Sequence, residues 1–75
     1  MKVKTQIKLL RNCNVSIVNG YGNQLTEIKV DENGEIWAYE NLAEYELHEN
    51  DTIHHIDVAL FDWDDELTYF IVVRG

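Results

Sequence analysis

The chain has 75 residues and a mass of 8.8 kDa, with fourteen acidic residues, six basic residues, one cysteine and no proline. A chain this short is expected to form one domain, residues 1–75, and to remove only about 60% of its unfolded surface from water. Apolar residues at 45% and charged residues at 27% are typical of a folded domain and exclude a disordered acidic tail.

The sequence shows no secretory signal and no membrane span, because lysines interrupt the apolar residues of the first ten positions. Cys13 alone makes no intramolecular disulfide, and secreted domains of this size usually rely on several such bridges. We therefore expect a cytoplasmic protein that does not contact a membrane.

Residues 2–9 alternate apolar and polar side chains, the period of two that marks a strand with one buried face. Val3, Ile7 and Leu9 lie on the apolar face, and lysines occupy the other. The pattern therefore predicts a first strand with a basic, solvated face.

Two hairpins are predicted next. Strands over residues 15–18 and 24–30 flank residues 19–23, where glycines and asparagines favour a chain reversal. Asn33-Gly34 is the strongest local signal, because a two-residue type I′ turn requires positive φ at both central positions. This turn is predicted to join residues 24–30 to a strand over residues 35–40.

Residues 41–47 fit either a short helix capped by Asn41 or a strand at a sheet edge, and the pattern does not decide between them. After a polar loop, Ile56, Val58 and Leu60 line one face of a further strand. Residues 67–74 are apolar on both faces, which favours a position inside a sheet or a barrel.

These elements predict a mainly β protein, or an α+β protein if residues 41–47 are helical. The expected architecture is a small antiparallel sheet or barrel of about six short strands with at most one short helix.

The charge is unevenly distributed. Residues 1–30 carry five bases and one acid, whereas residues 31–75 carry one base and thirteen acids. Pairing of the basic first strand with an acidic late strand would contribute roughly 0.2–1 kcal/mol per cross-strand pair. The net charge of −8 on the whole chain opposes direct binding to nucleic acid or anionic lipid.

Catalysis is not expected, and no catalytic residue is assigned. The segment Gly20-Tyr21-Gly22 lacks the Gly-Lys-Ser/Thr that completes a phosphate-binding loop, so it is interpreted as a turn. Nothing in the spacing brings Cys13 or Ser16 to a histidine base. A core this small also leaves little room for a ligand cavity of about 300 Å³.

No metal and no cofactor are expected either. His48, His55 and Asp57 are the best candidate ligands, but their spacing matches no established zinc pattern and no cysteine pair accompanies them. A solvated or strand-pairing role is favoured for these side chains.

The segment Asp62-Trp63-Asp64-Asp65-Glu66 places a large aromatic side chain among four carboxylates between the last two strands. Trp63 either folds back over the end of the sheet or anchors a contact with a basic protein surface. Trp37 and Tyr39 share one face of their strand, and either extend that contact surface or belong to the core. The predicted partner-binding residues are therefore Asp62, Trp63, Asp64, Asp65, Glu66, Trp37 and Tyr39.

Composition thus favours a small acidic, non-enzymatic binding protein that occupies a basic, nucleic-acid-binding surface of a larger protein and mimics DNA there. An inhibitor from a phage or another mobile element is the nearest analogy. The alternative is a self-assembling or accessory structural module, such as a homodimer, that pairs its basic first strand with the acidic face of another copy.

Overall fold

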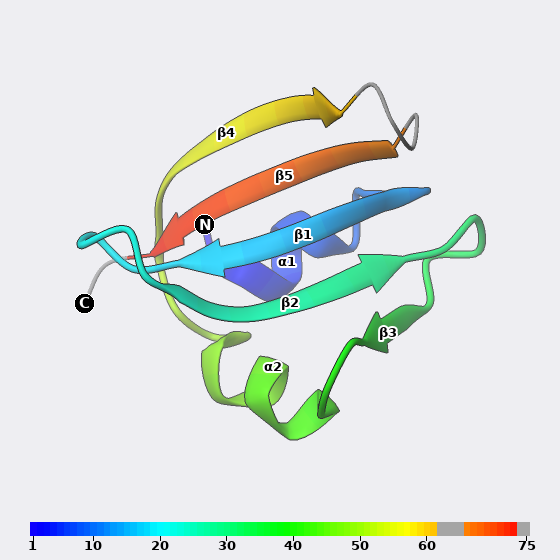
Figure 1. The fold of residues 1–75 in the computed structure, drawn as a ribbon. Coiled ribbons are helices and arrows are strands. Elements are labelled where there is room, and N and C mark those ends of the chain that lie inside the picture. The colour runs from blue at the N-terminus through cyan, green and yellow to red at the C-terminus, as the bar shows by residue number, and fades with distance from the viewer. Residues whose placement is uncertain (62–65, 74–75) are drawn as a thin grey trace.

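The computed structural model describes residues 1–61 and 66–73. Five of its seven elements are strands, and these form one open sheet in the order β3-β2-β1-β5-β4 (Figure 1). Neighbouring strands are antiparallel, except that β1 and β5 run parallel. The elements in chain order are α1 (Val3–Ile7), β1 (Cys13–Val18), β2 (Gln24–Val30), β3 (Ile36–Ala38), α2 (Leu42–His48), β4 (Ile53–Phe61) and β5 (Glu66–Val73).

The predicted class is confirmed as a small α+β domain with a mostly antiparallel sheet, and the helical alternative for residues 41–47 is the correct one. Asn41 caps α2, because its Oδ1 accepts a hydrogen bond from the backbone N–H of Ala43 at 2.9 Å. β5 lies between β1 and β4, the interior position that its two apolar faces predicted. The described chain has five strands and two helices, where about six strands and at most one helix were expected.

The prediction of a strand over residues 2–9 is wrong, because the segment contains α1. Val3 and Ile7 share a face in a helix as well as in a strand, so this short pattern fits both periods. The burial of the side chains distinguishes the helical period from the strand period. Ile7 and Leu10 are 2% and 7% exposed, whereas Leu9 is 70% exposed. The buried positions therefore follow the helical spacing of three and four residues.

The start of α1 is held by a distant part of the chain. The backbone N–H of Val3 donates to the carbonyl of Asp51 at 3.0 Å, and that of Lys4 donates to the carbonyl of Glu49 at 2.8 Å. These bonds satisfy two of the donors that a helix N-terminus leaves unpaired. With the lysines of this segment on or beside a helix, the predicted pairing of a basic first strand with an acidic late strand is also wrong.

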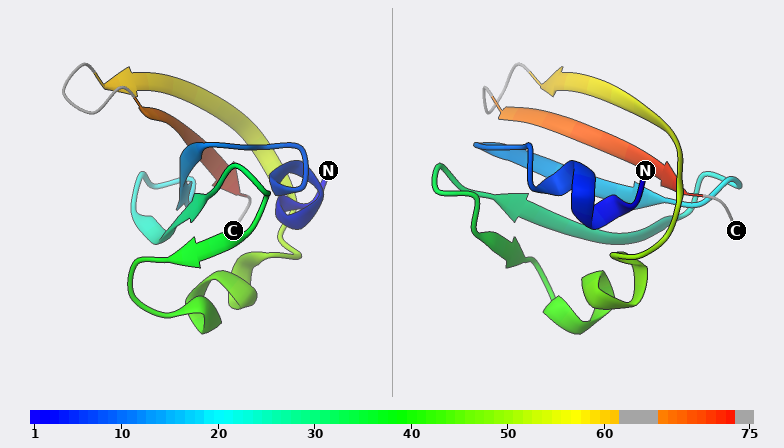
Figure 2. Two further views of the ribbon diagram at one scale, coloured as in Figure 1. Left: turned by 90° about the vertical axis from the view of Figure 1, so that its right-hand side faces the viewer. Right: turned by 180° about the vertical axis from the view of Figure 1, so that it is seen from behind.

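The core lies between the sheet and α1, which crosses the back of the sheet in the view of Figure 1 and its front in the right panel of Figure 2. Alternate residues of the strands point toward this helix, as the period of two requires. The buried apolar side chains are Val3, Ile7, Leu10, Cys13, Val15, Ile17, Ile28, Val30, Tyr45, Ile71 and Val73.

Tyr45 brings α2 into the same core, where it is 3% exposed. Burial raises the pKa of its phenol to about 12, and the nearby carboxylate of Glu49 raises it in the same direction. No helix lies over the opposite side of the described sheet, here called the open face (Figures 1 and 2).

The hairpin between β2 and β3 forms as predicted, but its turn is not of the two-residue type. Asp31 N–H donates to the carbonyl of Glu35 at 3.0 Å, so that three residues form the loop, and Gly34 has a φ of +84° while Asn33 does not have positive φ. The Asp31 carboxylate selects this longer turn, because its Oδ1 accepts from the N–H groups of Asn33 and Glu35, both at 2.8 Å.

The β1–β2 hairpin repeats this arrangement. Asn19 Oδ1 accepts from the N–H groups of Tyr21 and Asn23, both at 3.0 Å, and Gly22 has a φ of +86°. Both turns have an Asn or Asp followed three residues later by a glycine with positive φ, a spacing that the sequence-based prediction of a two-residue turn did not take into account.

The described residues are compactly arranged. The radius of gyration is 11.4 Å, close to the value of about 11 Å expected for a compact chain of this length. Neither α1 nor α2 has the length and apolar composition that a membrane crossing needs, within the part of the chain that the structure describes.

Candidate functional site

Of the predicted contact residues, the structure describes the side chains of Trp37 and Tyr39. Trp37 lies on β3, and Tyr39 is the first residue after the end of that strand. Both side chains lie on the open face of the sheet. They are 60% and 59% exposed, which excludes the interpretation that they belong to the core. Asp62, Trp63, Asp64 and Asp65 lie outside the described residues, and the same holds for the side chain of Glu66.

Two strands, β2 and β1, separate β3 from β5 in the sheet. Trp37 pairs with Lys29 on β2, Lys29 with Asn14 on β1, and Asn14 with Thr68 on β5. At about 4.8 Å per strand, β3 and β5 lie roughly 14 Å apart. Trp37 and Tyr39 therefore form a candidate site at the β3 edge, away from β5.

The indole of Trp37 is exposed but held in one orientation. Its Nε1–H donates to Oδ2 of Asp31 at 3.1 Å, while the other oxygen of that carboxylate closes the β2–β3 turn. The indole hydrogen bond, followed by the N–H of Glu35, lowers the pKa of Asp31 below its ordinary value of 3.8. The turn thus positions an aromatic side chain through a carboxylate that remains ionised.

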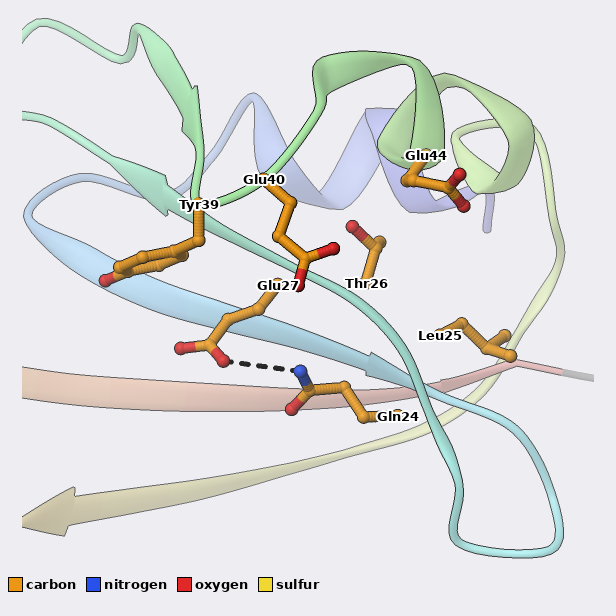
Figure 3. Close-up of a pocket in the computed structure, with 7 residues that line it drawn as sticks. All are labelled: Gln24, Leu25, Thr26, Glu27, Tyr39, Glu40 and Glu44. Carbon is orange, nitrogen blue, oxygen red and sulfur yellow. Dashed lines mark hydrogen bonds between the residues drawn. The ribbon is translucent and has the colours of Figure 1, made fainter.

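Tyr39 is held in a similar way on the neighbouring part of the open face. Its hydroxyl donates to Oδ1 of Asn14, a residue of β1 that is 7% exposed, and its ring extends across β2 toward β1 (Figure 3). Its backbone N–H donates to the carbonyl of Glu27 at 3.5 Å, just beyond the end of β3. Both its backbone and its ring therefore contact neighbouring strands.

A groove adjoins Tyr39 at the same edge of the sheet. Because β3 ends at Ala38, the first residues of β2 have no strand partner on the side away from β1. On that side α2 lies beside them. The space between β2, α2 and their connection has a volume of about 260 Å³. Its lining residues are Gln24, Leu25, Thr26, Glu27, Tyr39, Glu40 and Glu44 (Figure 3).

The groove is anionic. Glu27, Glu40 and Glu44 contribute three carboxylates, and no Lys, Arg or His belongs to its lining among the described residues. Gln24 Nε2 donates to Glu27 Oε2 at 3.4 Å (Figure 3). Ser16 Oγ in turn donates to Gln24 Oε1 at 2.9 Å. Glu27 is thereby connected to a polar network that ends at Ser16, a side chain only 3% exposed.

This groove was not predicted, because it depends on where the pairing between β2 and β3 stops. The residue pattern predicted a strand over residues 35–40, which would have paired along more of β2. The only local signal was Asn41, whose helix cap requires the strand to end before it.

The candidate metal ligands do not converge. His48 Nδ1 lies 2.9 Å from Asp51 Oδ2 beside α2, whereas His55 Nε2 lies 3.5 Å from Asp57 Oδ2 on β4. His54 Nδ1 and His55 Nδ1 are 2.7 Å apart, as one donor and one acceptor. Within residues 1–61 and 66–73, no three His, Cys, Asp or Glu side chains form a group that could hold a metal ion.

The fold therefore defines a small α+β domain with one helix-covered face, one open face and an anionic groove at the β3 edge. No protein-family model matches the chain, and neither a curated protein nor a solved structure matches it.

The lowered pKa of Asp31 predicts an acid transition at Trp37. Because the pKa in the folded protein lies below the unfolded value of 3.8, the stabilising contribution is present above that pH and is lost as the pH falls through the folded pKa. We expect the Trp37 indole N–H resonance in NMR spectra to shift only below pH 3.8, and to lose this transition in Asp31→Asn. Glu32→Gln, in the same turn, should leave it unchanged, and a transition centred above pH 3.8 would contradict the assignment.

Proposed function

We propose that this protein is a non-enzymatic binding protein for a basic segment of a larger protein. The contact is made by the aromatic–acidic surface, defined here as Trp37, Tyr39, Glu27, Glu40 and Glu44. The observation that carries the proposal is the placement of two exposed aromatic side chains, each held by a hydrogen bond, beside a groove lined by three glutamates.

The aromatic side chains meet the requirements of binding anchors. Tryptophan and tyrosine contribute much of the energy at protein interfaces, and a side chain that is already oriented loses less conformational entropy on binding. Trp37 and Tyr39 are two residues apart on one face of an extended segment, so a single partner segment can contact both.

The groove supports a basic partner in particular. Its volume of about 260 Å³ lies just below the roughly 300 Å³ typical of small-molecule sites, and it suits a Lys or Arg side chain. Three carboxylates favour a cation electrostatically, and the Tyr39 ring offers an aromatic surface beside them. Surface carboxylates also accelerate encounters with a basic partner, which makes association sensitive to salt.

The net charge of −8 supports a partner surface that itself binds nucleic acid. Lysines and arginines that neutralise phosphates also attract carboxylates, so an acidic protein can compete for them as an inhibitor would. The alternative of a module that uses a basic first strand is less well supported, since residues 2–9 contain a helix.

The proposal is tested by affinity capture from the source organism at low and high salt, with a fluorescent hexa-arginine peptide as a defined second probe. Glu40→Lys combined with Glu44→Lys should weaken both interactions at least about tenfold, equivalent to about 1.4 kcal/mol. Glu32→Lys combined with Glu46→Lys is the matched control, because it makes the same charge change at exposed glutamates outside the groove lining.

Trp37→Ala should reduce capture at both salt concentrations, since its contribution is largely apolar. Equal losses in the groove variant and in the control would attribute binding to net charge and reject the groove as the site. The combined variant Trp63→Ala, Asp64→Lys and Asp65→Lys examines the other predicted contact residues, and undiminished capture would remove them from the site.

A further inference from the structure

β4 forms the edge of the sheet opposite to the aromatic–acidic surface. It is the longest strand, with nine residues, and pairs with β5 on one side. Among residues 1–61 and 66–73, the other side is occupied only at its start, where Ile53 N–H donates to the carbonyl of Met1 at 2.9 Å and Thr52 forms a bridge with Lys2. A long edge strand with free backbone groups is a template for pairing with another strand.

Exposed apolar side chains lie beside this free edge. Val58 and Leu60 on β4 are 55% and 59% exposed, and Leu67, the β5 partner of Leu60, is 40% exposed. All three lie on the face that carries the core, since Leu67 is also the register partner of Cys13. α1 therefore leaves this corner of its own face uncovered. Adjacent exposed apolar residues, unlike isolated ones, favour an interface.

We infer that two copies of this chain pair antiparallel along β4, about a two-fold axis at Val58, to form one continuous sheet. A bulge between Ile53 and His55 interrupts the regular pairing of β4 near its start. Pairing with β5 is regular from His55 to Phe61, and Val58 is the centre of that segment.

The side chains of β4 are self-complementary in this register. Val58 faces Val58 of the second copy, and Ile56 faces Leu60 of the second copy, which joins the two apolar corners. On the open face, Asp57 faces Ala59 of the second copy. Moving the axis to Asp57 would place two carboxylates opposite each other, and shifting the pairing by one residue would put apolar side chains against the wrong face. Charge and pattern therefore select Val58 as the centre.

The oligomeric state tests this inference. In sedimentation equilibrium at up to about 1 mM protein, a range that detects even weak dimers, we expect a mass approaching twice 8.8 kDa. Val58→Lys should raise the dimer dissociation constant about tenfold or more, because two ammonium groups would face each other at the axis. Leu47→Lys introduces the same charge at a leucine of α2 that is 70% exposed, and should leave the constant unchanged.

A disulfide cross-link tests the register. Val58→Cys should give a covalent dimer on mild oxidation, because directly opposed residues of paired strands lie within disulfide range. Leu47→Cys should form no covalent dimer under the same conditions, and native Cys13 is only 1% exposed. A mass of 8.8 kDa at all concentrations would overturn the inference, and so would a dimer that survives Val58→Lys unchanged or is lost in Trp37→Ala. Because these variants lie on opposite edges of the sheet, failure of the dimer leaves the proposed partner binding to be judged by its own experiment.

Discussion

Replacing Ile7 with alanine is expected to lower the free energy of unfolding by about 2–5 kcal/mol, the usual range for removing a large aliphatic side chain from a core. Ile7 is 2% exposed and packs from α1 onto the sheet. A domain of this size has a total stability of roughly 4–11 kcal/mol, so the loss is a large fraction of it. Urea unfolding followed by circular dichroism measures the effect.

Leu9→Ala is the matched control, because Leu9 is 70% exposed, and we expect a change of no more than about 0.5 kcal/mol. If residues 2–9 formed a strand, Ile7 and Leu9 would share its buried face and the two substitutions would have similar costs. Comparable losses would therefore contradict α1. Should Ile7→Ala be too unstable to study, Ile7→Val is expected to cost about 0.5–1.5 kcal/mol.

Gly34→Ala is expected to cost about 1–3 kcal/mol, somewhat more than the same change at Gly22. Both glycines have positive φ, +84° and +86°, where a Cβ costs roughly 1–2 kcal/mol. At Gly34 the new Cβ would also lie 2.7 Å from Cζ of Arg11, whereas nothing lies within 4 Å of it at Gly22. The difference between the two substitutions therefore reports the Arg11 contact.

The additional cost at Gly34 arises from hydrogen bonds of Arg11. Its Nη1 donates to the carbonyls of Lys8 at 3.0 Å and Leu10 at 2.6 Å, and a displaced guanidinium loses them. In an Arg11→Ala background, Gly34→Ala and Gly22→Ala should have equal costs, as measured by a double-mutant cycle from urea unfolding. An unchanged difference in that background would show that Arg11 is not its cause.

Much of the sheet could be predicted from local pattern alone. The strand over residues 24–30 has the predicted bounds, and the segment predicted over residues 56–60 lies inside β4. These segments combine alternating or continuous apolar residues with turn residues at their ends, and such signals depend on neighbours in the sequence. The helical alternative for residues 41–47 was based on Asn41, and this signal is also local. The side chain of a capping residue hydrogen-bonds to the first turn of its own helix.

The candidate site could be predicted only in part. Trp37 and Tyr39 were recognised as partners on one face, but their exposure depends on which face α1 covers. The contribution of Glu40 and Glu44 follows from the end of β3, which leaves room for the groove beside β2. The residue pattern alone does not predict where the pairing between β2 and β3 ends, because that position depends on how α2 packs.

By itself, the sequence determined that the protein is mainly β or α+β, the positions of the principal strands, both hairpins and the excess of carboxylates in its second half. Tertiary structure decided that residues 2–9 contain a helix, that β3 and β4 are the edges, and that the acidic groove adjoins Tyr39. A five-residue helix is too short to be stable alone in water. It forms because its apolar side chains pack on the sheet and its first N–H groups reach the carbonyls of Glu49 and Asp51, contacts that exist only in the folded chain.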